Sequence, residues 1–160
     1  MVRKVFFSFH FDRDSWRVGH VRNCVTTMEK SVFLDGATWE SIKKAGDDAI
    51  KRWIDSQLNG TSITAVLIGT QTSQRKYVRY ELIKSWEKGN GILGIYIHNC
   101  EDKNGSTDIQ GNLDFGINFK DRYGIGKTFS ERFQIYDWVH QDGYHNIEKW
   151  IETAAREAGR

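Results

Sequence analysis

The sequence predicts an α/β fold in which about five mainly parallel strands form one doubly wound sheet, with helices on both faces. Short apolar runs alternate about five times with segments whose apolar residues recur at helical spacing. The apolar runs are continuous, which is typical of strands buried on both faces of a parallel sheet. No linker, repeat or low-complexity segment interrupts this order, so we expect one domain over residues 1–160.

The first half of the chain contains three predicted strands and two predicted helices. Residues 4–11 and 31–34 form strands, and Asp12 or Asp14 can cap the helix that follows the first of them. The apolar positions of that helix are Trp16, Val18, Val21 and Val25. After the second strand, Thr38 suits the N-cap of one long helix that ends at Asn59, and residues 63–68 form the third strand.

In the second half, residues 77–87 read as a helix that stops at Gly89, and residues 92–97 as the fourth strand. Residues 98–130 show no clear period, and a loop of that length is usually functional or mobile. A fifth strand is expected over residues 133–138. The last helix has one apolar face, formed by Ile147, Trp150, Ile151, Ala154 and Ala155.

Composition excludes several classes of protein. The formal charge is +2, from 23 basic and 21 acidic residues that are interspersed, which argues against a nucleic-acid partner. No apolar stretch approaches the roughly 20 residues that span a bilayer. The N-terminus is too quickly polar for a signal peptide, so we expect a cytoplasmic protein without a membrane partner. Cys24 and Cys100 then read as reduced thiols, with a disulfide as the lesser alternative.

The most informative segment is 71–81, which leads from the third strand into a helix. It places Glu81 one turn after Tyr77, near the carboxyl ends of the strands, where open α/β sheets bind ligands. A carboxylate beside the aromatic rings of Tyr77 and Tyr80 suits stabilisation of an oxocarbenium-like centre, as in cleavage of a glycosidic bond. A solvated glutamate paired with Arg79 or Lys84 is the alternative that the residues alone leave open.

Other polar residues follow strands at the same edge of the sheet. The loop at 8–14 combines a hydroxyl, an imidazole, an aromatic ring and arginine, and could receive a nucleotide. His10 alone is also consistent with a structural histidine. Asp35 reads as a turn former or as a ribose contact. The histidines and cysteines lack the spacing of a zinc site, so no metal is expected.

Three other nucleotide- or phosphate-linked classes do not fit. Residues 124–128 look like the end of a phosphate loop, but position 121 is Asp where glycine is needed, and no clear strand precedes it. The third strand ends in Ile68-Gly69-Thr70, which contains no phospho-acceptor aspartate of the receiver type. The loop after the first strand is not the hydroxyl- and glycine-rich phosphate loop of a flavodoxin.

The order of these landmarks resembles the TIR domain. Residues 5–9 resemble its first-strand signature, residues 32–35 resemble its second strand running into the BB loop, and residues 77–81 resemble the aromatic-x-x-x-Glu motif of NAD-cleaving members. Four further stretches, 39–46, 60–62, 67–70 and 93–98, are similar to the TIR-like branch of the ThsB proteins of the bacterial Thoeris anti-phage system. The resemblance covers about residues 3–155.

The resemblance implies a flavodoxin-like sheet, with NAD as a substrate rather than a bound cofactor, and release of nicotinamide. By this likeness Glu81 is the catalytic carboxylate that contacts the nicotinamide ribose. The substrate-binding residues that it implies are Phe9, His10, Asp35, Ser73 and Tyr77. Three departures stand out: Tyr77 replaces the usual Trp, residues 36–38 and an early helix replace the usual BB loop, and His10 and Phe11 stand where arginines often follow the first strand.

The function implied by the resemblance is that of an NAD nucleosidase or ADP-ribosyl cyclase-type hydrolase in anti-phage defence. Its product would be a cyclic ADP-ribose-type nucleotide that activates a separate effector. A phage trigger protein and a homo-oligomer are the other partners that the family implies. The alternative is a non-catalytic TIR-like module for protein interaction or nucleotide binding.

Overall fold

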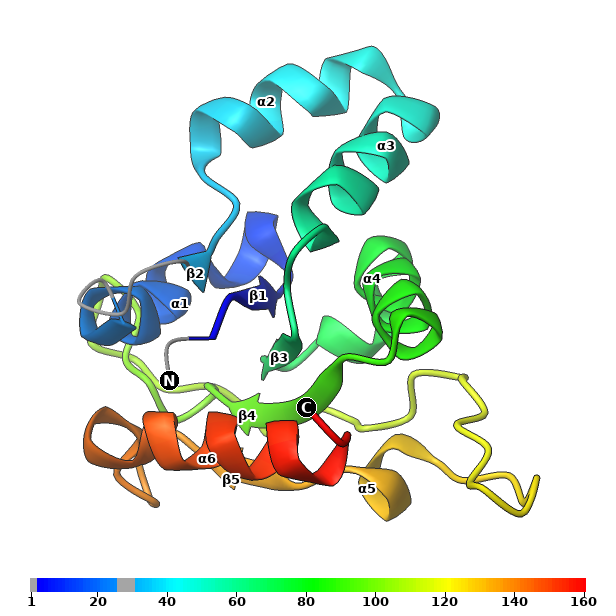
Figure 1. The fold of residues 1–160 in the computed structure, drawn as a ribbon. Coiled ribbons are helices and arrows are strands. Elements are labelled where there is room, and N and C mark those ends of the chain that lie inside the picture. Colours follow the sequence, from blue (N-terminus) through cyan, green and yellow to red (C-terminus); the bar gives the residue numbers. More distant parts are fainter. Residues whose placement is uncertain (1–2, 26–30) are drawn as a thin grey trace.

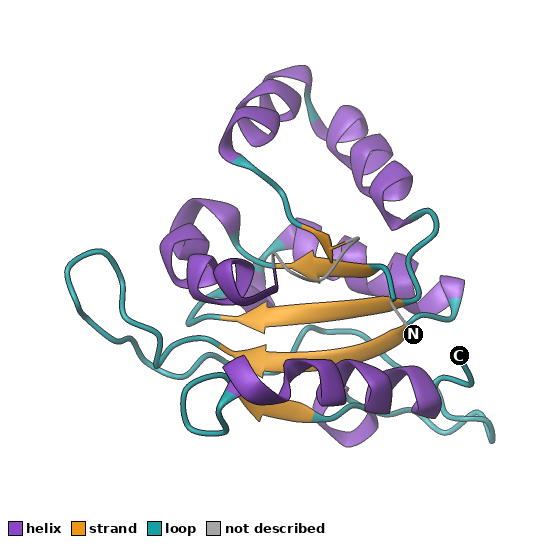
Figure 2. Ribbon diagram, turned by 60° about the vertical axis from the view of Figure 1, so that its left-hand side comes forward, coloured by secondary structure: helices purple, strands orange, loops and turns teal. Residues whose placement is uncertain are grey.

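In the computed structural model, which describes residues 3–25 and 31–160, five strands form one parallel sheet in the order β2-β1-β3-β4-β5. The strands are β1 (Val5–Ser8), β2 (Ser31–Val32), β3 (Ile63–Ile68), β4 (Gly91–Tyr96) and β5 (Ile135–Asp137). Figure 2 shows that their arrowheads point to the same edge. The predicted α/β fold with a parallel, doubly wound sheet is confirmed.

Helices cover both faces of this sheet (Figure 1). They are α1 (Phe11–Val25), α2 (Gly36–Ala45), α3 (Asp47–Leu58), α4 (Lys76–Lys88), α5 (Phe129–Arg132) and α6 (Gly143–Glu157), with a short 3₁₀ turn, η1 (Thr72–Gln74). Helices α1 and α6 pack on one face in a single apolar cluster. Helices α3 and α4 contribute to two clusters on the other face.

The central strand β3 is apolar at every position except Thr64, whose hydroxyl is hydrogen-bonded to Ser85. All six of its residues are buried. Ile63, Ala65 and Leu67 belong to the cluster with α1 and α6, whereas Val66 and Ile68 belong to the cluster with α4. Because successive side chains point to opposite faces, a strand covered on both sides needs apolar residues at nearly every position.

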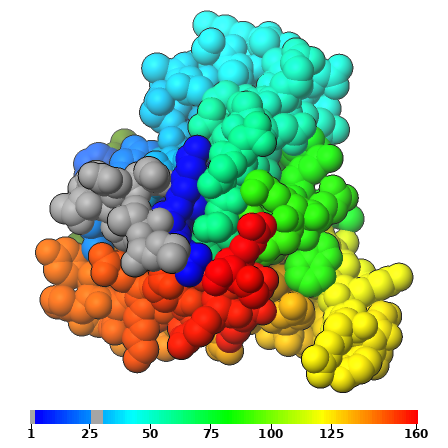
Figure 3. Space-filling view, in the orientation of Figure 1, coloured from blue at the N-terminus to red at the C-terminus, as the bar shows by residue number. Residues whose placement is uncertain are grey.

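The prediction of one long helix ending at Asn59 is wrong, because the chain reverses direction at Gly46 and forms two helices, α2 and α3. Gly46 has φ +97°, a conformation that side chains with a Cβ rarely adopt. The N-cap of α2 is Asp35 rather than Thr38, since Asp35 Oδ1 accepts a hydrogen bond from the Thr38 amide at 2.7 Å. The α2–α3 hairpin stands above the rest of the molecule in Figure 3.

Helix α1 buries a different face from the one predicted. Trp16 was expected in the core but is 59% exposed, whereas Asp14 is completely buried. The Asp14 carboxylate lies against the backbone of Gly69, at the end of β3, where a Cβ would collide with it. This contact rotates the inward face of α1 toward Asp14, which leaves the indole of Trp16 in solvent.

The long segment between β4 and β5 is largely a packing element. Phe115, Phe119 and Phe129 are buried in the same cluster as Val78 and Leu82 of α4. The Phe119 ring meets Trp86 of α4 edge to face, with centroids 5.4 Å apart. These phenylalanines therefore cover the sheet face with little helix: only α5 is helical in the crossover from β4 to β5.

Several strand ends differ from the predicted ones, whereas the two cysteines agree with the favoured prediction. Strand β1 ends at Ser8 and Phe11 already belongs to α1, whereas the predicted strand reached Phe11. Strand β5 begins at Ile135 rather than at residue 133. Cys24 and Cys100 are both thiols, as the favoured prediction had it.

Candidate active site

Glu81 lies on the inward side of α4, close to the carboxyl edge of the sheet. Helix α4 begins directly after the turn that leaves β3, so its first two turns stand over this edge. The Glu81 residue is only 8% exposed. The alternative of a solvated glutamate does not hold, because Lys84 pairs with Glu87 and Arg79 donates to the Gly116 carbonyl.

Glu81 lines a small, partly open cavity of about 30 Å³. The cavity is lined from the β1–α1 junction, from the segment around α2 and from α4 by Phe9, His10, Phe11, Asp12, Leu34, Trp39, Arg75, Tyr77, Val78 and Glu81. Four aromatic rings form a continuous wall, with centroid distances of 6.0 Å for Phe9–Phe11, 6.1 Å for Phe11–Trp39 and 6.4 Å for Trp39–Tyr77. This volume is about that of one water molecule.

Three of the buried polar atoms without a hydrogen-bond partner among the described residues lie close to this cavity. They are Glu81 Oε2, His10 Nδ1 and the hydroxyl oxygen of Ser8, the last residue of β1. Buried polar groups are normally satisfied, because an unpaired one costs about 1–3 kcal/mol. Other unpartnered buried atoms in the described part of the chain belong to Arg13, Asp14, Asn90 and His98, but only this group gathers beside a cavity lined by aromatic rings. Such a grouping is typical of a site that binds a polar ligand.

The environment changes the protonation of the two titratable groups in this cluster. Burial raises the pKa of Glu81 to about 8, and the nearby Ser8 hydroxyl offsets part of the rise, although its geometry is too poor for a good hydrogen bond. Burial lowers the pKa of His10, and the positive charge of Arg75 lowers it further. At neutral pH the buried Glu81 carboxyl is therefore mostly protonated, and His10 is neutral.

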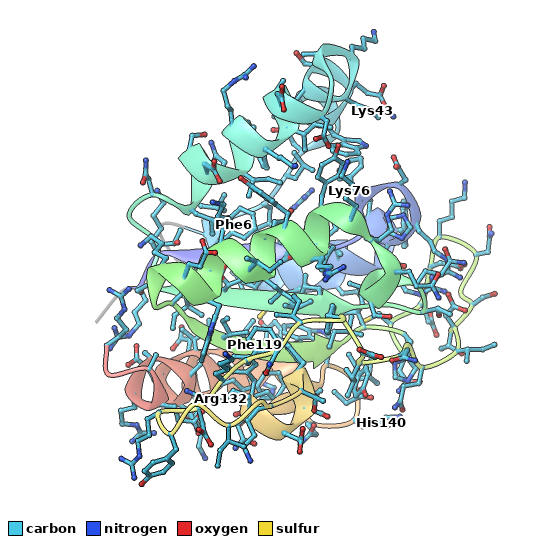
Figure 4. The ribbon with its side chains drawn as sticks, turned by 90° about the vertical axis from the view of Figure 1, so that its right-hand side faces the viewer. Phe6, Lys43, Lys76, Phe119, Arg132 and His140 are labelled. Carbon is cyan, nitrogen blue, oxygen red and sulfur yellow. The ribbon has the colours of Figure 1, made fainter. Side chains whose placement is uncertain are left out.

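Hydrogen bonds from α2 and α3 hold the aromatic wall in place. The Tyr77 hydroxyl donates to Asp47 Oδ1 at 2.6 Å, and Lys76 Nζ lies 2.7 Å from the same oxygen. Figure 4 shows Lys76 at the start of α4, below the α2–α3 hairpin. On the other side of the cavity, Trp39 Nε1 donates to Asp12 Oδ1 at 2.9 Å. The hairpin is thus fixed to both α1 and α4.

The structure brings most, but not all, of the predicted site residues together. Phe9, His10 and Tyr77 line the cavity with Glu81. Asp35 does not: it is exposed, and its carboxylate accepts two hydrogen bonds from Thr38 as the cap of α2. Ser73 lies in η1 and lines a different, larger hollow.

Trp39 and Arg75 line the cavity but were not singled out from the sequence, whereas Ser8 was anticipated only as the hydroxyl of the loop at 8–14. Arg75 lies within the segment 71–81, so its position at the strand exit was a usable signal. Trp39 carried no such signal, because its contact with Tyr77 depends on how the α2–α3 hairpin folds back.

Residues 3–25 and 31–160 contain neither a candidate metal centre nor a candidate membrane span. No three His, Cys, Asp or Glu side chains gather there in an arrangement that could hold a metal ion. Within the same ranges, no helix has the length and apolar character needed to cross a bilayer.

The parallel sheet and the inward carboxylate after β3 define a TIR-like domain, and this chain belongs to the Thoeris ThsB family. The family model for the Thoeris protein ThsB, TIR-like domain, matches residues 6–102. The chain is also similar to a protein of Bacillus cereus (strain MSX-D12) with the provisional name cyclic ADP-D-ribose synthase ThsB1. The two are 36% identical over 191 aligned positions, which cover 94% of this chain and all of the relative.

Proposed function

We propose that this chain is an NAD-cleaving enzyme of bacterial anti-phage defence. It releases nicotinamide and closes the remaining ADP-ribose into a cyclic ADP-ribose-type nucleotide, which activates a separate effector. The observation that carries the proposal is the buried Glu81 carboxyl, grouped with unpartnered atoms of Ser8 and His10 at the ligand-binding edge of the sheet. The name of the Bacillus cereus relative supports the same product class.

The reaction breaks the bond between C1 of the nicotinamide ribose and the ring nitrogen. The bonding electron pair goes to that nitrogen, so nicotinamide leaves as a neutral molecule and positive charge develops on the ribose. A carboxylate placed against this charge lowers the barrier by electrostatic stabilisation. Two carboxylates line the cavity, and Glu81 is the buried one, whereas Asp12 is half-exposed and accepts a hydrogen bond from Trp39. The ring of Tyr77 lines the same cavity.

Glu81 must be ionised for this role, although burial raises its pKa to about 8. The nicotinamide group of NAD carries a positive charge, and a nearby cation favours the charged form of a carboxyl group. Binding of NAD therefore lowers the pKa of Glu81 and releases its proton. The negative charge forms only when the substrate that needs it is present.

Cyclisation requires that a hydroxyl group of the same ADP-ribose reaches C1 before water does. The oxygen forms the new bond and its proton is lost, with His10 as a neutral acceptor in the cavity lining. The aromatic wall of Phe9, Phe11 and Trp39 keeps water away from the cation, which favours ring closure over hydrolysis.

The decisive experiment replaces Glu81 by Gln, which keeps the shape of the protonated carboxyl but cannot ionise. Nicotinamide release and the cyclic nucleotide are measured by chromatography and mass spectrometry, in cells with and without phage. We expect Glu81→Gln to abolish both products. Glu87→Gln is the matched control, because Glu87 lies on the same helix with its side chain 61% exposed. Undiminished nicotinamide release by Glu81→Gln would disprove the assignment.

A non-catalytic module for protein interaction or nucleotide binding is the alternative. The small volume of the Glu81 cavity favours it, because about 30 Å³ cannot hold nicotinamide without rearrangement. The same experiment separates the two functions: a nucleotide-binding module binds NAD tightly without releasing nicotinamide, and an interaction module ignores NAD even in infected cells.

A further inference from the structure

A second hollow lies next to the Glu81 cavity, between the start of α4 and the segment that follows β4. It has a volume of about 450 Å³ and is lined by Ser73, Gln74, Arg75, Lys76, Arg79, Asp114, Phe115 and Gly116. Arg75 lines both cavities, so the two share a wall. A volume of this size is within the range of ligand sites, roughly 300–1,000 Å³.

The lining of this hollow is mainly basic. It contains three cations and one carboxylate, Asp114, whose Oδ1 accepts a hydrogen bond from the Gly116 amide. Lys76 is held by Asp47 at 2.7 Å, and Arg79 donates to the Gly116 carbonyl at 3.0 Å. Arg75 is different, because its guanidinium makes no hydrogen bond or ion pair within residues 3–25 and 31–160. Its charge nevertheless reaches His10 in the Glu81 cavity.

Ser73 provides an independent sign of a polar ligand. It is only 9% exposed, it lines the hollow, and its hydroxyl makes no hydrogen bond with the described residues. Helix α4 also begins without a capping side chain. Helix N-termini attract anions through their free amides and the helix dipole. The Arg75 guanidinium, the Ser73 hydroxyl and the N-terminus of α4 thus all favour an anion in this hollow.

We propose that this hollow binds the diphosphate group of NAD, with Arg75 at the junction between the two cavities. This inference rests on the proposed function, because the diphosphate lies one ribose away from the bond that Glu81 would help to break. With the nicotinamide ribose in the Glu81 cavity, the diphosphate of the dinucleotide would lie beside Arg75, which borders both cavities. Arginine pairs strongly with phosphate oxygens because its planar donors bind them in a bidentate manner.

The two volumes also imply an order of binding. The diphosphate hollow is already open at about 450 Å³, whereas the Glu81 cavity holds about 30 Å³. The diphosphate binds first, and its binding energy helps to open the aromatic wall for the nicotinamide ribose.

The first test uses inorganic pyrophosphate and isothermal titration calorimetry on the full chain. We expect the wild-type protein to bind it, and both Arg75→Gln and Ser73→Ala to weaken that binding, by about tenfold for Arg75→Gln because a charge-assisted contact is lost. Arg122→Gln is the control, since Arg122 is a basic residue that contacts Tyr123 in an exposed turn. Equal binding by wild type and Arg75→Gln, or no binding at all, would overturn the proposal.

The second test asks whether the bound anion belongs to the NAD site. Pyrophosphate should compete with NAD in nicotinamide release, and Arg75→Gln should raise KM for NAD by about tenfold with a smaller change in kcat. Pyrophosphate that binds without competing would indicate a separate anion site and refute the diphosphate assignment. If no NAD is cleaved under any condition, the proposed function fails, and the calorimetry still decides whether the hollow binds an anion.

Discussion

The indole nitrogen of Trp39 on α2 donates a hydrogen bond to Asp12 Oδ1 on α1 at 2.9 Å. Both residues line the Glu81 cavity, and the Trp39 ring also meets Tyr77 of α4 edge to face. Trp39 therefore links three helices around a space that is too small for the nicotinamide ribose of the proposed substrate. Any movement that admits the nicotinamide ribose must displace this ring or its neighbours.

Trp39→Phe should make the cavity easier to open. The phenyl ring keeps the apolar contact with Tyr77 but cannot donate to Asp12, which removes a bond worth about 1 kcal/mol. We expect a several-fold rise in kcat/KM for NAD and a slightly lower melting temperature. Trp16→Phe is the control, because this indole on α1 is 59% exposed and lies outside the cavity lining. A fall in kcat/KM would mean that the Trp39 hydrogen bond serves the closed, reacting state instead.

Glu81→Gln should change how stability depends on pH. Burial raises the pKa of Glu81 from its ordinary 4.5 to about 8, so the folded protein binds this proton more tightly than the unfolded chain. The proton's contribution to stability is complete below pH 4.5 and is lost as the pH rises to about 8. Glutamine is always neutral and avoids that loss. We therefore expect the variant to exceed wild type in stability by a few kcal/mol at pH 9 and to match it near pH 5.

Melting temperatures measured by circular dichroism from pH 5 to pH 9 check this expectation. A difference of several degrees should develop toward high pH. The Glu87→Gln control should show no such trend, because the Glu87 side chain is 61% exposed. If wild type and Glu81→Gln differ by the same amount at every pH, Glu81 does not titrate as a buried group.

Gly46→Ala should destabilise the α2–α3 hairpin. The residue has φ +97° and ψ −178°, a region that only glycine adopts readily, so a Cβ there costs about 1–3 kcal/mol even though no atom lies within 4 Å of it. Gly19→Ala in the middle of α1 is the matched control. Its surroundings are equally open but its φ is not positive, so alanine should stabilise the helix by up to about 1 kcal/mol. Urea denaturation compares the two; a loss of stability in both would show that crowding, rather than backbone conformation, decides the effect.

The sequence predicted the sheet well because buried parallel strands leave an unmistakable pattern. Residues 63–68 were expected as a strand from their apolar run alone, and β3 has those bounds. The place of Glu81 near the sheet edge was predictable for a related reason, since the segment after a central strand starts a helix there; that its side chain faces inward was not, because a solvated glutamate fitted the sequence equally. Polar residues at an expected strand exit are therefore strong signals for a site.

Other features depend on tertiary contacts that no local pattern encodes. The apolar period continues across Gly46, so nothing in spacing alone shows that the helix reverses there. Asp35 was a candidate ribose contact, but its carboxylate is occupied by Thr38 once α2 begins at Gly36. Trp16 has the right spacing for the core, yet the buried Asp14 takes the inward position in its place.

The phenylalanine-rich crossover after β4 limits how far this chain can be truncated. The recognisable family match stops at residue 102, but Phe115, Phe119 and Phe129 lie beyond it and shield Val78 and Leu82 from solvent. A fragment cut at that apparent boundary would also lack β5 and α6, leaving β4 as a bare sheet edge with uncovered aliphatic side chains. Such a piece would associate with copies of itself rather than remain monomeric, so the shortest workable version must retain the C-terminal third.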